Sequence, residues 1–291
     1  MRGIVMAGGT GSRLFPVTLS VNKHLLPVYD KPMIFYPIAV LMLAGVREIL
    51  VITRSADIPS FKRVLGDGSA LGLAIEYRAQ KKPRGIADAF TIGRDFIEGH
   101  RVALILGDNI FFGSTLRSIL RRRSRFNRGA VNFVYQVSQP ERFGILRLDS
   151  RKKPLEIIEK PNPAPSKWAV TGLYFFDEQV SEMAAQLRPS ARGELEITDI
   201  NNMYLRAGKL AIEQLGRGLL WLDVGTPEAL LGAGQFVQTV ETRQGLKIAS
   251  LEEIAWRQGF IDAAAFAKLA AAQRGTPYAN HLHRLAGMEE L

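Results

Sequence analysis

The chain opens with a short apolar segment that leads directly into a glycine-rich loop, and this junction limits what the chain can fold into. The segment Gly-Ile-Val-Met is followed by Ala-Gly-Gly-Thr-Gly-Ser-Arg-Leu. Three glycines within four positions, Gly8, Gly9 and Gly11, allow a tight turn that exposes backbone N–H groups to a ligand. Arg13 adds a guanidinium suited to phosphate oxygens, and Lys23 follows ten residues later. The pattern predicts a phosphate-binding loop with two cations.

Two common phosphate-binding motifs do not match this loop. The dinucleotide fingerprint requires a third glycine where Leu14 stands, and the P-loop requires Gly-Lys followed by Ser or Thr. A plain tight turn is therefore an alternative for the glycines alone. The longer string Gly-Gly-Thr-Gly-Ser-Arg-Leu, followed by Lys-His-Leu-Leu-Pro at 23–27, is far more specific.

Apolar runs of strand length alternate with stretches of helical period through the first half of the chain. We expect strands at 3–6, 48–53, 73–78 and 102–106, and helices at 33–44, 58–65 and 86–97. This alternation indicates an α/β fold with a parallel sheet covered on both faces. Ligands of such sheets bind beyond the carboxyl ends of the strands, where the glycine-rich loop and Gly107-Asp108-Asn109 both lie.

The middle of the chain is richer in strands than the first part, and the end is mainly helical. Further strands are expected at 130–137, 144–148, 155–159, 168–176 and 219–223. They predict a mixed-sheet extension that carries a second substrate. From Pro227 onward we expect helices, and the alanine-rich stretch 263–272 is expected to pack on the core or on another subunit.

Composition narrows the class of protein further. Lys and Arg number 38 against 28 Asp and Glu, a net charge of +10, which favours anionic partners. The absence of cysteine excludes disulfides and thiolate metal sites. The amino terminus enters a strand without a signal peptide, and the longest apolar stretch is too short to span a bilayer. A cytoplasmic protein with no membrane association is the expectation.

Two aspartates stand at the ends of apolar strands. Asp108 follows the strand at 102–106, and Asp223 closes Leu-Leu-Trp-Leu-Asp. Magnesium binds a few carboxylates together with substrate phosphates and water, so the pair suggests metal-assisted phosphoryl or nucleotidyl transfer. Capping of a turn is the alternative for Asp108, and capping of the next helix is the alternative for Asp223. Thr226 is the better placed cap for that helix, which leaves Asp223 free.

The complete set of motifs resembles the signature of the sugar-phosphate nucleotidylyltransferases, or nucleotide-sugar pyrophosphorylases. The matches include the glycine-rich loop, the lysine before Leu-Leu-Pro, Leu-Gly-Asp-Asn at 106–109 and Trp-Leu-Asp-x-Gly-Thr at 221–226. Others are Tyr-Asp-Lys-Pro-Met at 29–33, Phe-Gly at 143–144, Glu-Lys-Pro at 159–161, Val-Thr-Gly-Leu-Tyr at 170–174, Arg-Gly-Glu-Leu-Glu-Ile-Thr-Asp at 192–199 and Arg-Gln-Gly-Leu-Lys at 243–247. The resemblance covers nearly the whole chain.

The resemblance implies a fold and a division of the chain. The expected fold is α/β and Rossmann-like, with a mixed, mainly parallel central sheet flanked by helices and a helical C-terminal region. Residues 1–226 are expected to form the nucleotidyltransferase core, with a nucleotide half at 1–110 and a sugar-phosphate half at 111–226. Residues 227–291 are expected to be a helical region for packing or oligomerisation, and a homotetramer is the expected assembly.

The resemblance also implies an activity. The branch with the best match transfers a thymidylyl group from dTTP to glucose 1-phosphate with Mg²⁺, releasing dTDP-glucose and pyrophosphate for dTDP-rhamnose or related deoxysugar synthesis. The residue roles that it implies are Arg13, Lys23 and Lys160 for catalysis; Gly8, Gly9, Gly11, Ser12, Gln80 and Gly85 for the nucleotide; Asn109, Gly144, Glu159 and Val170 for the sugar; and Asp108 and Asp223 for the metal ion.

Three residues depart from the pattern near the expected nucleotide site, and they leave the base preference open. His24 stands where relatives usually carry Gln, Arg84 replaces an acidic residue, and Asp88 replaces a Gln. Transfer from another triphosphate such as UTP, or to another sugar phosphate, is one alternative. A non-catalytic nucleotide-sugar sensor is another, although a sensor need not keep both metal ligands and the cations.

The run Arg-Arg-Arg-Ser-Arg at 121–125 is the densest basic segment. Such a run could bind nucleic acid, but no aromatic residue interleaves it and no nucleic-acid motif accompanies it. We interpret it as the solvated end of a surface helix and expect no nucleic-acid partner.

Overall fold

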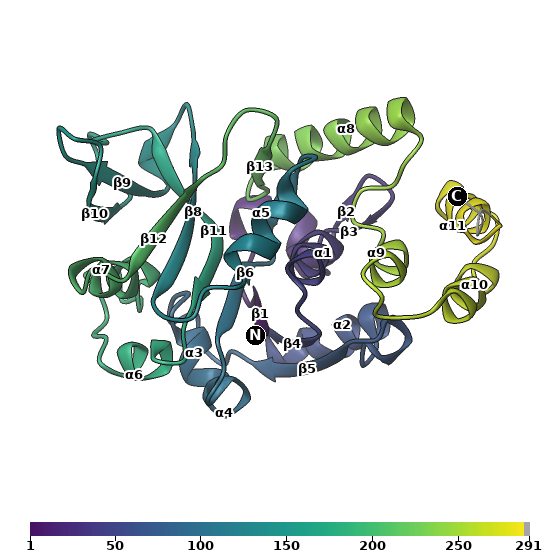
Figure 1. Cartoon of the computed structure of the whole chain (residues 1–291), viewed down its shortest axis with the longest axis horizontal. Helices are drawn as coiled ribbons and strands as arrows, with labels where there is room; N and C mark the ends of the chain where they lie inside the picture. The colour runs from purple at the N-terminus through teal and green to yellow at the C-terminus, as the bar shows by residue number, and fades with distance from the viewer. Residues whose placement is uncertain (288–291) are drawn as a thin grey trace.

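A nine-stranded mixed sheet forms the centre of the computed structural model, which describes residues 1–287 (Figure 1). Seven strands run in the order β10-β9-β11-β6-β1-β4-β5, and β8 and β12 extend the sheet from β11. The strands are β1 (Arg2–Ala7), β4 (Glu48–Thr53), β5 (Ala74–Ala79), β6 (Val102–Leu106), β8 (Ala130–Gln136), β9 (Gly144–Leu148), β10 (Pro154–Glu159), β11 (Trp168–Phe176) and β12 (Leu210–Gln214). Two small ribbons pair β2 (Pro27–Val28) with β3 (Lys31–Pro32), and β7 (Asn109–Phe112) with β13 (Leu220–Asp223).

The strands of the first half are parallel, as the sequence predicted. β1 pairs in parallel with both β4 and β6, and β4 pairs in parallel with β5. β11 then runs antiparallel to β6, β8 and β9. The carboxyl ends of β1, β4 and β6 therefore meet at one edge of the sheet. The glycine-rich loop and Asp108 are brought together at that edge.

Helices cover both faces of the sheet. They are α1 (Phe35–Ala44), α2 (Ile58–Leu65), α3 (Asp88–Ile92), α4 (Arg94–Ile97), α5 (Leu116–Arg123), α6 (Val180–Ala185), α7 (Ile197–Arg206), α8 (Pro227–Gln244), α9 (Leu251–Arg257), α10 (Ala263–Ala271) and α11 (Pro277–Ala286). Side chains of β1 alternate between two apolar clusters. Val5 packs with α1, α2 and α5, whereas Ile4 packs with α3, α4 and α7. Burying an aliphatic side chain of this size contributes roughly 1.5–3 kcal/mol, so β1 stabilises both layers.

The helix expected at 86–97 is divided into α3 and α4 at Gly93. A Cβ at this position would lie 3.0 Å from the side chain of Leu50 and 3.2 Å from that of Ile4. The backbone at Gly93 therefore packs directly on the sheet, and glycine is also a poor helix former. Close packing against β1 and β4 interrupts a segment that its apolar period alone predicts as continuous.

From α8 at Pro227 onward, the described part of the chain contains helices and no strands, as expected. α8 begins at a Thr226 cap, whose hydroxyl accepts a hydrogen bond from the N–H of Ala229 at 3.3 Å, and Pro227 occupies its first turn. The cap assignment made from the sequence is confirmed. α10 packs on α9 and α11 rather than on the main core, through a small cluster of Phe266, Ala270 and Leu282.

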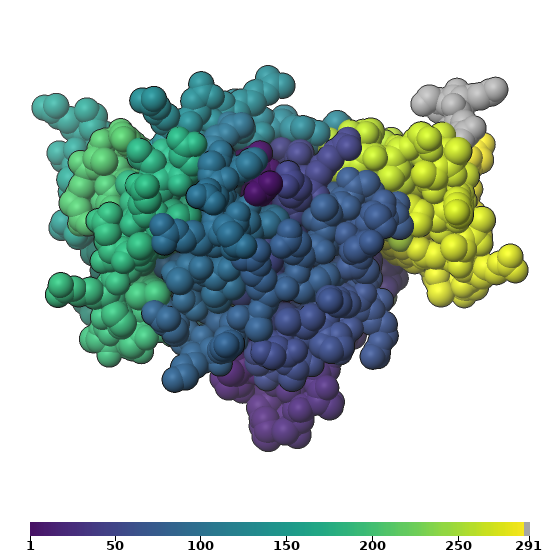
Figure 2. Space-filling view, turned by 90° about the horizontal axis from the view of Figure 1, so that it is seen from below, coloured from purple at the N-terminus to yellow at the C-terminus, as the bar shows by residue number. Residues whose placement is uncertain are grey.

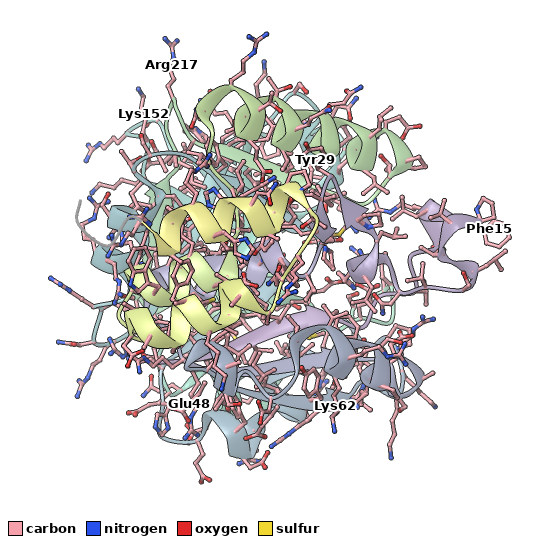
Figure 3. The ribbon with its side chains drawn as sticks, turned by 90° about the vertical axis from the view of Figure 1, so that its right-hand side faces the viewer. Phe15, Tyr29, Glu48, Lys62, Lys152 and Arg217 are labelled. Atoms are coloured by element: carbon pink, nitrogen blue, oxygen red, sulfur yellow. The ribbon has the colours of Figure 1, made fainter. Side chains whose placement is uncertain are left out.

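The C-terminal helices lie together at one end of the molecule, and the loop after β1 projects from another side (Figures 1 and 2). Phe15 lies at the tip of that loop and points away from the body, with 64% of its surface exposed (Figure 3). A buried ion pair links β3 to α8, because the Lys31 Nζ donates to the Glu241 Oε1 at 2.9 Å. Within residues 1–287, no helix combines the length and apolar character needed to cross a membrane.

Candidate active site

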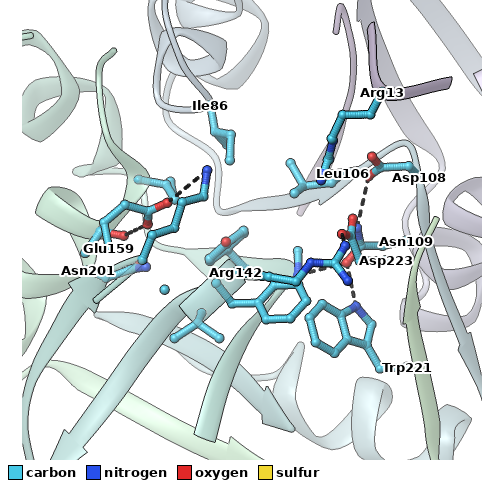
Figure 4. A pocket seen from close by; sticks show the side chains of 18 residues that line it. Arg13, Ile86, Leu106, Asp108, Asn109, Arg142, Glu159, Asn201, Trp221 and Asp223 are labelled. Atoms are coloured by element: carbon cyan, nitrogen blue, oxygen red, sulfur yellow. Dashed lines mark hydrogen bonds and ion pairs between the residues drawn. The ribbon is translucent and has the colours of Figure 1, made fainter. Parts of the chain in front are cut away.

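Two adjoining cavities open at the carboxyl edge of the parallel strands, and Figure 4 shows the larger of them. The larger has a volume of about 450 Å³ and the smaller about 220 Å³. Ile86, Leu106 and Asp108 line both cavities. The structure therefore places one carboxylate at the boundary between two spaces of small-molecule size, as a reaction between two substrates requires.

The glycine-rich loop borders the smaller cavity. Gly9 and Lys23 line it, and Gly8 lies against the Gln80 side chain. Gly11, in the left-handed conformation, precedes a 3₁₀ turn at Ser12–Leu14. That turn carries the catalytic candidate Arg13 into the larger cavity. The loop thus contributes to both spaces.

The two aspartates predicted as metal ligands line the same cavity. β7 and β13 pair antiparallel and set Asp223 opposite Asn109, and the N–H of Val224 donates to the carbonyl oxygen of Asp108 at 2.9 Å. These two backbone contacts bring together strand ends that are distant in sequence. Sequence spacing could not show whether Asp108 and Asp223 meet, and the structure places both of them in one cavity.

Opposite shifts in pKa distinguish the two carboxyl groups. Burial, and then repulsion from Asp108, raise the pKa of Asp223 to about 6. Burial would also raise the pKa of Asp108, but the Lys23 ammonium, which is ion-paired to its carboxylate, together with His24, holds it below its usual range. The pair is therefore a place where added positive charge would be stabilising.

The donor set fits a magnesium ion. No group of three or more His, Cys, Asp or Glu side chains suited to a metal occurs among residues 1–287. Mg²⁺ does not need such a cage, because it is held by one or two carboxylates and completes its shell with phosphate oxygens and water. The mutual repulsion of Asp108 and Asp223 supplies the electrostatic reason for a cation at this position.

The Asn109 side chain is held by three groups of the protein. Its Oδ1 accepts from the Trp221 indole N–H at 2.6 Å and from the N–H of Gly172 at 2.9 Å. Its Nδ2 donates to the Asp108 Oδ1 at 3.0 Å (Figure 4). Trp221 is also packed edge-on against Phe143, with 5.1 Å between the ring centres. Asn109 therefore orients Asp108 while it lines the cavity.

The three sugar-site candidates other than Asn109 also line the larger cavity, together with Lys160; they are Gly144, Glu159 and Val170. Glu159 lies at the end of the cavity opposite Asp108 (Figure 4). β9 pairs with β10 so that Gly144 faces Glu159. The Glu159 carboxylate accepts from the Thr198 hydroxyl at 2.7 Å and lies 3.9 Å from the Lys160 Nζ. A fixed carboxylate beside a cation suits a ligand that carries both hydroxyl and phosphate groups.

Sequence reasoning missed several residues of this cavity. Arg142 is the most informative, because it lies 3.8 Å from Asp223 and its guanidinium sits 5.6 Å from the centre of the Phe143 ring (Figure 4). Arg192 is not a lining residue of the cavity, but it supports one, because its Nη1 donates to the Glu159 Oε1 at 3.2 Å. The position of Arg142 next to Phe-Gly was the only available signal. The other missed residues are Thr198 and Asn201.

In the smaller cavity, a close backbone contact fixes the position of Gly85. Gly85 has a φ of +101°, and a Cβ there would lie 2.4 Å from the carbonyl oxygen of Leu195. The Gln80 amide donates to the Asp88 Oδ2 at 3.1 Å and to the carbonyl oxygen of Gly85 at 3.4 Å. Arg84 is 4.0 Å from Asp88. Arg84 and Asp88, which depart from the family pattern, therefore lie next to Gln80 and Gly85, the pair predicted to recognise the base.

The third departure, His24, is buried beside Lys23 in the smaller cavity. The Asn22 Oδ1 faces the His24 Nδ1 at 2.8 Å and also accepts from the His24 N–H at 3.0 Å. The Asn22 amide donates to the carbonyl oxygen of Ala7 and to Asp57, which sets its orientation. Because an amide oxygen only accepts, the Nδ1 carries the hydrogen, and the Nε2 is an acceptor.

We expect this histidine to make the protein sensitive to acid. Burial and the neighbouring Lys23 lower the pKa of His24 to about 3, whereas an unfolded histidine has a pKa of about 6.5. The buried neutral ring therefore makes its full contribution to the free energy of unfolding above about pH 6.5. That free energy falls by about 1.4 kcal/mol per pH unit as the pH drops from there towards 3. His24→Gln should remove this part of the dependence of the unfolding free energy on pH. The measurement is urea unfolding at a series of pH values.

The matched control for that experiment is His100→Gln, which replaces an exposed imidazole far from the cavity. Parallel stability curves for the wild type and His24→Gln between about pH 6.5 and 4 would show that the buried ring is not the acid-sensitive group.

A glycine-rich loop, two strand-end carboxylates and several cations at the carboxyl edge of an α/β sheet are features of enzymes that act on nucleotide phosphates. The family model described as nucleotidyl transferase matches residues 2–240. The chain belongs to this family of nucleotidyl transferases.

Individual relatives are similar over their whole length. The glucose-1-phosphate thymidylyltransferase of Neisseria meningitidis serogroup A is 53% identical over 285 residues, which cover 98% of this chain and 99% of the relative. That of Mycolicibacterium smegmatis is 50% identical over 289 residues, covering 99% of this chain and all of the relative.

Solved structures agree with the fold. The crystal structure of a candidate glucose-1-phosphate thymidylyltransferase from Bacillus anthracis, in complex with sucrose, has a TM-score of 0.75 at 42% identity, covering 81% of this chain and 94% of that one. A UDP-glucose pyrophosphorylase bound to UDP-glucose has a TM-score of 0.71 at 22% identity, covering 82% and 98% of the two chains, and this likeness shows the fold alone. The expected mixed, mainly parallel sheet with flanking helices and a helical C-terminus is confirmed.

Proposed function

We propose that this chain transfers a thymidylyl group from dTTP to α-D-glucose 1-phosphate, giving dTDP-glucose and pyrophosphate. The observation that carries the proposal is the pair of adjoining cavities with Asp108 at their boundary and cations on both sides. Full-length similarity to thymidylyltransferases supports the choice of substrates. In this proposal the smaller cavity takes the nucleotide and the larger takes the sugar phosphate.

The reaction joins two anions, so repulsion between them is the main obstacle. An oxygen of the sugar phosphate attacks the α-phosphorus in line, a new P–O bond forms, and the bond to the β-phosphate oxygen breaks. Pyrophosphate leaves with that electron pair. The attacking oxygen is already ionised near neutral pH, so no general base is needed. Since one phosphoanhydride replaces another, the reaction should be readily reversible.

The cations of the site have separate proposed roles. Lys160, at the Glu159 end, holds the sugar phosphate, while Arg13 and Lys23 hold the triphosphate and stabilise the departing pyrophosphate. Such preorganised charges act where negative charge develops, and positioning adds the remaining advantage. Mg²⁺, held by Asp108 and Asp223, would supply Lewis-acid neutralisation of the phosphate oxygens.

The remaining site residues have proposed roles in binding. Gly8, Gly9, Gly11 and Ser12 would present the loop backbone to the nucleotide, and Gln80 and Gly85 would recognise its base. Asn109, Gly144, Glu159 and Val170 would contact the sugar. The nucleotide half at 1–110 and the sugar half at 111–226 then meet at Asp108. The helical region from 227 is proposed to assemble a homotetramer, although the last four residues of that range lie outside the described structure.

The test is pyrophosphate release from glucose 1-phosphate in the presence of Mg²⁺, comparing dTTP, UTP, ATP, CTP and GTP. Strong release with dTTP is the expected result. Release with a different triphosphate would keep the mechanism and assign the changed preference to His24, Arg84 and Asp88. If no triphosphate supports release with any sugar phosphate, the enzyme proposal fails and a nucleotide-sugar sensor takes its place.

A further inference from the structure

A third cavity, separate from the two of the candidate active site, lies at the basic C-terminal end of α5. Its volume is about 470 Å³. All of the charged side chains that line it are cationic: Arg122, Arg123, Arg125, Arg128 and Lys209. We call this cavity the arginine groove. The groove contains most of the arginine run at 121–125, namely Arg122, Arg123 and Arg125. None of these residues has a role in the proposed reaction.

The arginine groove lies at the edge of the sheet opposite the candidate active site. β11 runs antiparallel to both β6 and β8, so β8 points the same way as β6, and β12 is parallel to β8. The groove is lined by the first residues of β8 and β12, whereas the active site lies beyond the carboxyl ends of β1 and β6. No residue lines both the groove and either cavity of the active site.

A buried carboxylate organises two of the arginines. Glu213 on β12 is only 7% exposed. Its Oε1 accepts from the Arg122 Nη2 at 2.8 Å, and its Oε2 accepts from the Arg123 Nε. One carboxylate therefore fixes two neighbouring guanidiniums, and each keeps N–H groups that Glu213 does not use. Fixed guanidinium forks are well suited to phosphate oxygens.

Within residues 1–287, the other three cations of the groove have no counter-charge. Arg125, Arg128 and Lys209 make no ion pair with any residue of 1–287, and all three are exposed. Arg128 and Lys209 flank the joined starts of two strands, because the Ala130 N–H donates to the carbonyl oxygen of Lys209 at 2.8 Å. Cations in the last turn of a helix can complement its dipole, but these three lie beyond the end of α5.

The surrounding positive charge also affects the pKa of Arg121. Burial, and then Arg117 and Arg125, lower the pKa of its guanidinium. Like charges that lower a neighbour's pKa indicate a local excess that a bound anion would relieve.

We propose that the arginine groove binds a compact anion that carries two or more phosphate groups. Five cations around one buried carboxylate leave a local charge that a single phosphate would not balance. The volume lies in the range of small-molecule sites rather than of a polymer channel. The aromatic residue of the groove, Phe126, is stacked on Phe175 and lies under Arg101, so no free ring is available for base stacking. This site is additional to the proposed reaction.

The test is calorimetric titration of the full chain with diphosphate, in EDTA so that no metal complex forms. The double variant Arg125→Gln/Lys209→Gln removes two unpaired cations. The matched control Arg151→Gln/Lys152→Gln makes the same change of charge in the β9–β10 turn, where Lys152 points into solvent (Figure 3). We expect the groove variant to weaken one diphosphate site by about tenfold or more, as expected for lost charge-assisted hydrogen bonds, and the control to leave it unchanged.

The comparison does not depend on catalysis, because diphosphate binding in the active site is common to both variants. Circular dichroism spectra equal to wild type confirm folding, and Arg128→Gln alone provides a milder variant. Identical titrations of the groove variant and the control would overturn the proposal. Binding of a single-stranded or duplex oligonucleotide that the groove variant loses, without a diphosphate site, would overturn it in favour of nucleic acid.

Discussion

Asp108→Asn should lower kcat/KM for the proposed transfer by about a thousandfold. The Asp108 carboxylate faces Asp223 in the larger cavity, and Asn109 fixes its direction. An amide of the same shape keeps one oxygen but loses the charge that would hold Mg²⁺. The measurement is pyrophosphate release at a series of Mg²⁺ concentrations, together with calorimetric Mg²⁺ binding in the presence of dTTP.

Asp199→Asn is the matched control, because Asp199 is an exposed aspartate in the first turn of α7. It should retain both activity and metal binding. Wild-type Mg²⁺ affinity in Asp108→Asn would remove this residue from the metal site, even if activity fell for another reason.

Lys23→Met should have the second large effect, and it should act on both stability and activity. The Lys23 ammonium and the Asp108 carboxylate form an ion pair whose side chains are only 13% and 9% exposed. Removing one partner leaves a buried charge uncompensated, which costs about 3 kcal/mol of unfolding free energy. Loss of the cation from the nucleotide cavity should also lower kcat by about a hundredfold or more. Urea unfolding and pyrophosphate release measure the two effects.

The double variant Lys23→Met/Asp108→Asn separates these contributions. It should be more stable than Lys23→Met alone, because the unpaired carboxylate is gone, yet it should remain inactive. Lys153→Met, at an exposed lysine, controls for the loss of a surface charge. Strictly additive losses of stability would show that the ion pair contributes nothing, and the buried-charge argument would then be wrong.

Much of the fold follows from local patterns in the sequence. The strand at 48–53, the strand at 102–106 and the helix at 58–65 are found with the predicted bounds. Runs of buried β-branched residues and amphipathic period carry this information within a single element. The strand-end positions of Asp108 and Asp223 could also be read directly, since each closes an apolar run. The boundary at Gly93 could not, because it depends on contact with Leu50 and Ile4.

The partners of these residues were decided by tertiary structure. Tyr-Asp-Lys-Pro-Met and Arg-Gln-Gly-Leu-Lys were separate motifs in the sequence. In the fold, Lys247 from the second donates to Asp30 in the first. Likewise, Trp221 reaches Asn109, and through it Asp108, only because β13 pairs with β7. No local pattern encodes such a pairing.

The arginine run at 121–125 shows the same division most clearly. Its sequence predicts charge at a helix end and nothing more. The structure adds Glu213 from β12, about ninety residues away, which turns two arginines into a fixed pair, and it adds Lys209 to the same groove. The sequence by itself determined the elements, the glycine-rich loop and the residue types available for chemistry, because these depend on neighbours along the chain. Only the tertiary structure decided which of those residues meet, because sheet pairing and burial join segments that have no local contact.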